Sequence, residues 1–182
     1  LTWTESTCEG IYACFIVSPQ EVHLEVVVQI LTVQNNRPLE PPFYYEWVEV
    51  GWVEYSWGGK FVFVKYDTQQ TGWQAPDPIP VEWNTTLFVA IHQETTLQWR
   101  TEIFGYINVL INFSNPPNCF GAFMKSTSRL NKVNMTFDCL SWFNNGAGNF
   151  WGNNTLGQSS TVTIYEHIYY ISMIDYAHHF NV

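Results

Sequence analysis

The sequence predicts an all-β fold, a jelly roll or β-sandwich of about nine or ten antiparallel strands with almost no helix. Three runs, 21–33, 86–103 and 161–176, alternate apolar and polar residues with the period of two that marks half-buried strands. No stretch keeps the 3.6-residue period of an amphipathic helix. Clusters of Asn, Gly and Pro separate the runs. A length of 182 residues fits one such sandwich.

The chain divides into an N-terminal cysteine-bearing lead, residues 1–20, and a single β-sandwich domain, residues 21–182. Within the lead, 11–17 has β character. The run 21–33 predicts a strand with apolar residues on one side and polar residues on the other. The apolar side carries Val22, Leu24, Val26, Val28 and Ile30, and the other side carries His23, Glu25 and Gln29.

The most unusual stretch is 43–57, "FYYEWVEVGWVEYSW", which is rich in aromatic residues and glutamates. With the turn 56–60 and the strand 61–66 it predicts a hairpin, in which Gly51 marks a bend or bulge. We expect its rings to be buried or to meet a neighbour, and Glu46, Glu49 and Glu54 to point outward.

The remaining elements follow the same pattern. Residues 86–92 and 96–103 predict a second hairpin, and further strands are expected at 106–113, 119–124, 133–143 and 161–176. A Gly- and Asn-rich loop spans 144–160.

The charge balance is acidic. Seven Lys and Arg oppose 16 Asp and Glu, for a net charge of -9. Nucleic acids and anionic membranes require basic patches, so neither is an expected partner. No apolar run approaches the roughly 18 residues of a membrane span. Only 13% of the residues are charged, and a surface of uncharged polar groups predicts tolerance of acid.

Glycosylation sequons and cysteines together indicate secretion. The chain opens at Leu1 without a charged-then-apolar segment, which we interpret as removal of a signal peptide. We therefore predict an extracellular or cell-surface protein that carries N-linked glycans and no other cofactor or metal. The four N-x-S/T acceptor sites are Asn84, Asn112, Asn134 and Asn153.

Four cysteines allow three disulfide connectivities. We favour the local pairing of Cys8 with Cys14 and of Cys119 with Cys139. A four-cysteine metal site is the alternative, but the sequence has no C-x-x-C spacing.

No catalytic constellation is evident from residue spacing. His178 and His179 are adjacent, so on a strand they would point to opposite faces. The motifs of serine hydrolases and nucleotide-binding enzymes are absent from the sequence. We therefore expect no catalytic residues and no enzymatic activity.

Two segments nevertheless carry a resemblance to an enzyme family. "WVEVGWVEY" and "VEWNTTLFVAIH", within 47–92, resemble two strands of the glutamic peptidases, which are secreted, acid-active, concanavalin-like jelly rolls. The resemblance places Glu49 where the family has its catalytic Gln. The family's catalytic Glu has no acidic counterpart in 119–125, "CFGAFMK". An acid-active peptidase is kept as an alternative.

A carbohydrate-binding, lectin-like module is a second alternative. Exposed rings stack on sugar faces, and several aromatic residues lie in or beside loops. These are Trp52, Trp57, Trp73, Phe150 and Trp151. Nine Trp also suit a core built from rings.

The favoured hypothesis is a structural subunit of an extracellular filament or surface assembly. The overall character resembles archaeal threads and pili, whose subunits donate a terminal strand to a groove in the next subunit. The proposed donor strand lies in the lead, with Ile11, Ala13, Phe15 and Val17 on one face, and the partner is a second copy of the chain. The alternative is a lead that folds back on its own domain.

Overall fold

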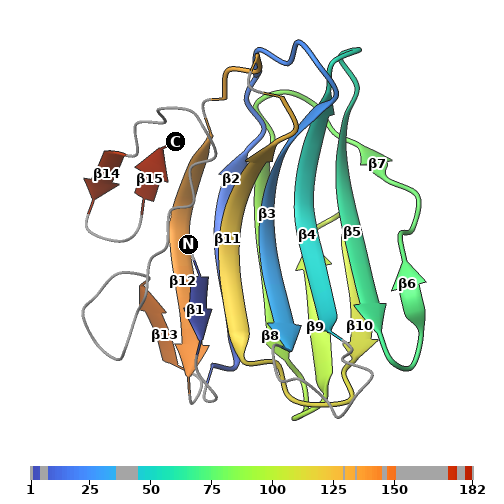
Figure 1. Cartoon of the computed structure of the whole chain (residues 1–182). Coiled ribbons are helices and arrows are strands. Elements are labelled where there is room, and N and C mark those ends of the chain that lie inside the picture. The colour runs from blue at the N-terminus through green and yellow to red at the C-terminus, as the bar shows by residue number, and fades with distance from the viewer. Residues whose placement is uncertain are drawn as a thin grey trace.

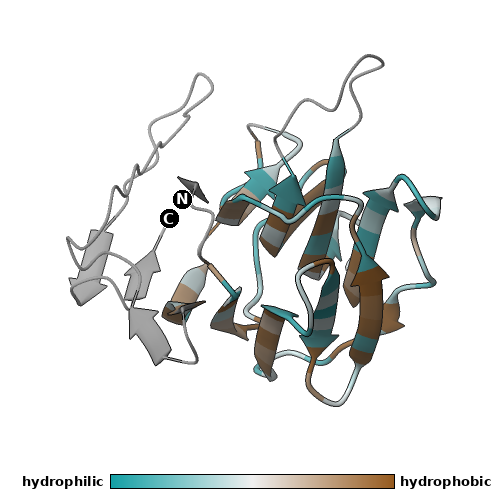
Figure 2. Cartoon of the chain, turned by 90° about the horizontal axis from the view of Figure 1, so that it is seen from below, coloured by the Kyte–Doolittle hydropathy of each residue, from teal (hydrophilic) through white to brown (hydrophobic). Residues whose placement is uncertain are grey.

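The protein is an all-β sandwich, which confirms the predicted fold class. The computed structural model describes residues 2–4, 8–35, 45–128, 130–133, 135–144, 147–150, 172–175 and 179–181. Two antiparallel sheets face each other, and Figure 1 shows the first in front of the second. The described residues contain no helix, and therefore none that could cross a membrane. Seen along the strands in Figure 2, the two sheets form two layers, and buried hydrophobic side chains make up the core of the sandwich.

The first sheet has the strand order β1-β11-β3-β4-β5-β6, with β7 also paired to β5. The predicted hairpin of residues 43–66 is present as β4 and β5. The strands are β1 (Thr2–Thr4), β11 (Cys119–Ser126), β3 (Val26–Asn35), β4 (Glu46–Tyr55), β5 (Lys60–Thr68), β6 (Gly72–Gln74) and β7 (Ile79–Pro80).

The second sheet has the order β10-β9-β8-β2-β12-β15-β14, with β13 also paired to β12. The second predicted hairpin is present as β8 and β9. Of the predicted strand 161–176, the described part is β14. The strands are β10 (Ile107–Asn112), β9 (Gln98–Ile103), β8 (Thr86–Gln93), β2 (Gly10–Ile16), β12 (Thr136–Asn144), β15 (His179–Asn181), β14 (Ser172–Asp175) and β13 (Ala147–Phe150).

A buried glutamine joins the two sheets inside the core. The Gln29 side chain on β3 is fully buried. Its Oε1 accepts a hydrogen bond of 2.7 Å from Trp52 Nε1, and its Nε2 donates one of 2.7 Å to the backbone oxygen of Thr136 on β12. Both polar ends of the amide are therefore satisfied, which a buried amide requires.

The face of β3 that carries Gln29 is the core face, contrary to the simplest interpretation of its sequence. Val27, Leu31 and Val33 share that face and are buried in the main core. Val26, Val28 and Ile30 lie on the opposite face, where Ile30 is buried in a second apolar cluster. Because both faces of β3 meet apolar neighbours, alternation alone did not identify the inner one.

The prediction of strand donation is wrong. β2 lies between β8 and β12 of its own chain, so the lead and residues 21–182 share one sandwich. Its backbone is hydrogen-bonded on both sides within the chain. The four expected donor side chains are buried in the chain's own core, which corresponds to the fold-back alternative. They are Ile11, Ala13, Phe15 and Val17.

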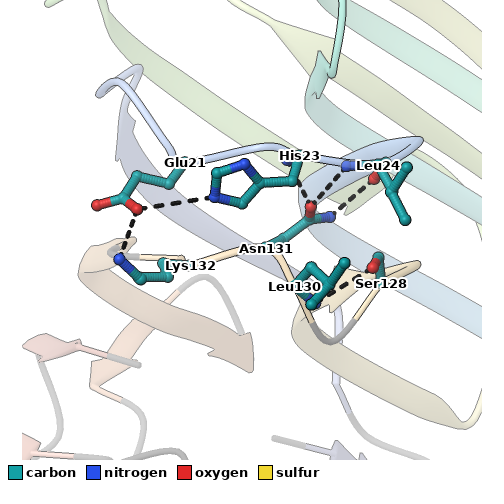
Figure 3. A network of polar contacts seen from close by, with 7 residues as sticks. All are labelled: Glu21, His23, Leu24, Ser128, Leu130, Asn131 and Lys132. Atoms are coloured by element: carbon teal, nitrogen blue, oxygen red, sulfur yellow. Dashed lines mark hydrogen bonds and ion pairs between the residues drawn. The ribbon is translucent and has the colours of Figure 1, made fainter.

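A buried asparagine fastens the connection between β11 and β12 to the segment that precedes β3 (Figure 3). Asn131 Oδ1 accepts the backbone N–H groups of His23 at 2.8 Å and Leu24 at 3.0 Å. Its Nδ2 donates to the backbone oxygen of Leu24 at 3.0 Å. Beside it, Lys132 Nζ lies 2.7 Å from Glu21 Oε2. The Asn131 side chain thus adds to the backbone bridge between Glu21 and Lys132, which joins the same two segments.

Replacing Asn131 with Ala should destabilise the fold by about 1–3 kcal/mol, because the part-buried backbone N–H groups of His23 and Leu24 would lose their acceptor. Urea unfolding measures this change. Leu130→Ala is the matched control, since its exposed side chain should contribute less than about 0.5 kcal/mol. Equal effects of the two substitutions would contradict the role given to Asn131.

Candidate functional site

Glu49 lies on the outer face of the first sheet, the face turned away from the second sheet. In register, it stands between Thr32 on β3 and Lys65 on β5. Its side chain is 25% exposed and accepts a hydrogen bond of 2.6 Å on Oε1 from Lys125 Nζ. Of the three glutamates in the 43–57 stretch, this is the one placed where a ligand on the sheet could reach it.

The partner of Glu49 comes from β11, on the far side of β3. Lys125 pairs in register with Val28, whereas Glu49 pairs with Thr32. The ion pair therefore crosses β3 diagonally above Ile30, which is buried. The Lys125 side chain is 53% exposed, so solvent reaches the ammonium group.

An apolar floor continues from Glu49 along the same outer face. Ile30, Val53 and Phe63 are buried there, and Phe61 and Phe123 pack against them. At the end of the floor, the ring of Trp57 stacks on Tyr55 with centroids 5.5 Å apart. A carboxylate and an ammonium group thus stand beside an apolar, aromatic surface.

Glu46 and Glu54 lie on the inner face, so the expectation that they point outward is wrong. β4 pairs without interruption with both neighbours, which also rules out the expected bulge at Gly51. Strict alternation therefore sends residues 46 and 54 toward the core at the two ends of the strand. Each buried carboxylate ties down a neighbouring segment.

The two inner carboxylates have backbone partners. Glu46 accepts the N–H of Ser114 at 2.8 Å and that of Gln69 at 2.9 Å. Glu54 accepts the N–H of Gln20 at 3.0 Å. Burial raises the pKa of Glu54, while the Gln20 bond and the charge of Lys60 oppose the rise. These two glutamates are structural.

Gly51 lies on the outer face, in the row next to Glu49. A Cβ atom at this position would lie 1.9 Å from the backbone oxygen of Gln29 on β3. Backbone atoms of a central strand cannot yield as the end of a flexible side chain can. Glycine is therefore required for the close approach of β3 and β4 beneath the Glu49 ion pair.

Gly51→Ala should destabilise the protein by about 1–3 kcal/mol, as overpacking of a core does. Thermal unfolding monitored by circular dichroism measures the loss. The change should also disturb Glu49 and Lys125, since β3 lies between their strands. Unfolding curves that superimpose on those of the parent protein would contradict the close approach.

The cysteines are not paired as expected. All four are free thiols in the structure. Cys14 on β2 stands opposite Asp138 on β12, next in the chain to Cys139, whose thiol donates to Asp138 Oδ1 at 3.7 Å. β12 is irregular at this point, and Cys139 has a φ of 50°. Burial, followed by the neighbouring Cys139 and Asp138, raises the pKa of Cys14 to about 11.

The other two cysteines have different surroundings. Cys8 Sγ donates to the backbone oxygen of Gly10 at 3.3 Å, and Cys119 Sγ accepts from Gln34 Nε2 at 3.3 Å. Both are buried. The sequence spacing of the cysteines did not predict that Cys14 and Cys139 are neighbours, because strand pairing brings together residues that are remote in sequence.

Under oxidising conditions, peptide mapping without reduction should find Cys14 linked to Cys139. The two cysteines lie on paired strands beside the irregularity in β12, and, after burial, the neighbouring Cys139 is one cause of the raised pKa of Cys14, so their proximity favours a disulfide between them. A Cys14→Ser variant should lose the crosslinked peptide. Detection of a Cys8–Cys14 or Cys119–Cys139 peptide would contradict this pairing.

The described sequons differ in accessibility. Asn84 is exposed in a turn, with a φ of 62°. Asn112 is half-buried at the end of β10. Asn134 and Asn153 lie outside the described residues. Glycosylation therefore stays a prediction.

The candidate sugar-binding rings do not form one platform. Trp52 is fully buried, whereas Trp57 and Trp73 are exposed. The side chain of Phe150 and the whole of Trp151 lie outside the described part. Among the described residues, no three His, Cys, Asp or Glu side chains gather in a way that could hold a metal ion.

The arrangement of the strands is shared with known structures, although no family model and no curated protein matches the sequence. Scytalido-glutamic peptidase with a peptide-based transition-state analog matches at a TM-score of 0.66 and 10% identity, over 99% of this chain and 94% of that chain. The chain has the fold of a glutamic peptidase.

Two further structures agree with this match. Scytalido-glutamic peptidase with a transition-state analog inhibitor matches at a TM-score of 0.64 and 9% identity. SCP-B, a member of the eqolisin family of peptidases in a complex with the tripeptide Ala-Ile-His, matches at 0.63 and 8%. Each match covers 99% of this chain and 94% of the other.

These likenesses correct the functional expectations. The glutamic-peptidase resemblance seen in residues 47–92 holds for the fold of the whole chain. The resemblance to filament subunits finds no support, and the hypotheses of a structural subunit and of a protein without enzymatic activity are wrong. Both rested in part on the absence of a catalytic spacing in the sequence, and spacing cannot detect residues that meet only across strands; the filament hypothesis also rested on the sequons, the cysteines and the low charge.

Proposed function

We propose that the protein is a peptidase-like hydrolase that binds a peptide on the outer face of the first sheet. The observation that carries the proposal is the Glu49–Lys125 pair. Glu49, on β4, stands where the sequence resemblance places the catalytic Gln of the glutamic peptidases, in a chain with their fold. The structural neighbours were solved with a tripeptide or transition-state analogs, which supports a peptide as the substrate class.

Glu49 is suited to act as the general base. Its carboxylate can take a proton from a water molecule that attacks the peptide carbonyl, provided that the water lies within hydrogen-bond reach, and can return that proton to the amine nitrogen as the C–N bond breaks. Because Glu49 is mostly buried yet still accessible, it can act on a bound substrate while bulk water is partly excluded.

Lys125 is suited to stabilise the negative charge that develops on the carbonyl oxygen. A positively charged donor placed beside a developing oxyanion acts in the same way as other oxyanion-stabilising groups. In the free protein this ammonium group is held by Glu49, so a substrate must enter between the two side chains. This Glu–Lys arrangement differs from the Gln–Glu pair that the resemblance implies.

The proposed mechanism depends on the protonation states of Glu49 and Lys125. The mechanism requires an ionised carboxylate at Glu49 together with a protonated Lys125. The apolar floor of Phe61, Phe63 and Phe123 would favour peptides with apolar side chains. An extracellular location is part of this proposal.

Replacing Glu49 with Gln should lower cleavage of a quenched fluorescent peptide library by about 100-fold or more, the scale of a lost general base. Lys125→Met should lower it by a similar factor. Glu54→Gln, a matched change on the opposite face of the same strand, should leave the rate unchanged, because Glu54 faces the core.

Two outcomes would overturn the proposal. One is full activity in Glu49→Gln. The other is the absence of cleavage by the parent protein between about pH 3 and 8 with folded protein verified by circular dichroism. A rate that depends on Glu54 and not on Glu49 would place the chemistry elsewhere.

A further inference from the structure

The second sheet also has a hollow on its outer face, on the opposite side of the sandwich from Glu49. Its volume is about 760 Å³, which falls within the range of small-molecule sites. The proposed hydrolysis uses none of its residues. β2, β8 and β9 supply most of the lining, and Phe143 on β12 closes one side.

A small residue surrounded by large ones creates the hollow. Ala90 on β8 pairs with Tyr12 on β2 and with Glu102 on β9. Its methyl group leaves space that the neighbouring rings border without filling. Phe88 is 59% exposed and Phe104 is 80% exposed, a large apolar area to leave in water.

The polar groups of the hollow give it an acidic character. Glu102 and Glu9 line it together with His92, whose Nε2 lies 3.5 Å from Glu102 Oε1. No Lys or Arg is among the lining residues. Arg100, the cation on β9, pairs in register with His92 and is hydrogen-bonded to Glu94 and to Asn108, although its charge also acts on Glu102.

We propose that this hollow binds an organic cation with an apolar body, such as an aromatic or alkyl amine. Tyr12, Phe88 and Phe104 supply aromatic rings, which can attract a cation, and the Glu102 carboxylate supplies the opposite charge. The apolar body would cover Ala90 and the exposed rings. An anion of the same size would meet two carboxylates and be rejected.

Three small probes of matched size separate charge from shape. Benzylamine is cationic, benzyl alcohol is neutral and benzoate is anionic at neutral pH. Two-dimensional NMR titration should show shifts centred on Ala90 and its neighbours, with benzylamine binding about 10-fold more tightly than benzyl alcohol and benzoate not binding. The 10-fold preference corresponds to about 1.4 kcal/mol.

Two variants and two controls locate the site. Glu102→Gln should reduce the affinity for benzylamine to that for benzyl alcohol, and Phe104→Ala should weaken both about 5-fold or more. Leu110→Ala, which removes an exposed side chain of the same sheet outside the hollow, should change neither. Glu49→Gln should also change neither, so this test is independent of the proposed hydrolase.

Several results would overturn the inference. Equal affinities for the three probes would show that charge plays no part, and shifts centred away from Ala90 would show another site. Unchanged benzylamine binding in Glu102→Gln would remove the role of the carboxylate. An absence of any shift up to about 50 mM benzylamine, far above the millimolar range of weak ligands, would exclude the site.

Discussion

The uninterrupted alternation of β4 is the constraint on which the first sheet depends. Because the strand pairs without a bulge with both β3 and β5, every second side chain enters the core. Trp52 reaches Gln29 on the inner side, while Glu49 is left on the outer side. A shift of one residue would bury Glu49 and expose Trp52. Gly51 permits this register by allowing the backbone of β3 to approach closely.

The sequence predicted the local parts of the fold well and the remote parts poorly. The hairpins β4–β5 and β8–β9 were correct, because a turn joins each pair of strands directly. The place of β2 was not predicted, because both of its partners are far along the chain. The core face of β3 was misjudged because apolar residues cover both faces and a fully satisfied amide, Gln29, belongs to the inner one.

The candidate site was also predicted only in the part that is local in sequence. The resemblance of "WVEVGWVEY" to a strand of the glutamic peptidases identified Glu49, because all residues of that segment are consecutive in the sequence. Lys125 was missed, because nothing in "CFGAFMK" reveals that β11 lies two strands away from β4. Glu46 and Glu54 look equivalent to Glu49 in the sequence, and only the fold separates the carboxylates that hold backbone N–H groups from the one that faces solvent. The hollow around Ala90 depends on a small side chain, which no motif marks.

The position of β2 has a consequence for how the chain folds during synthesis. Phe15 pairs with Leu87 on one side and with Phe137 on the other, so a strand made early must wait for partners made late. Such long-range pairing slows folding, because the chain loses conformational entropy on closing a long loop before the stabilising contacts between the strands can form. Until β12 emerges, one edge of β2 and its apolar face stay open to other chains, which is the condition under which nascent β proteins aggregate. The second sheet is therefore completed only when the last third of the chain has been made. Truncations in that part should first destabilise β2, which would lose its pairing with β12.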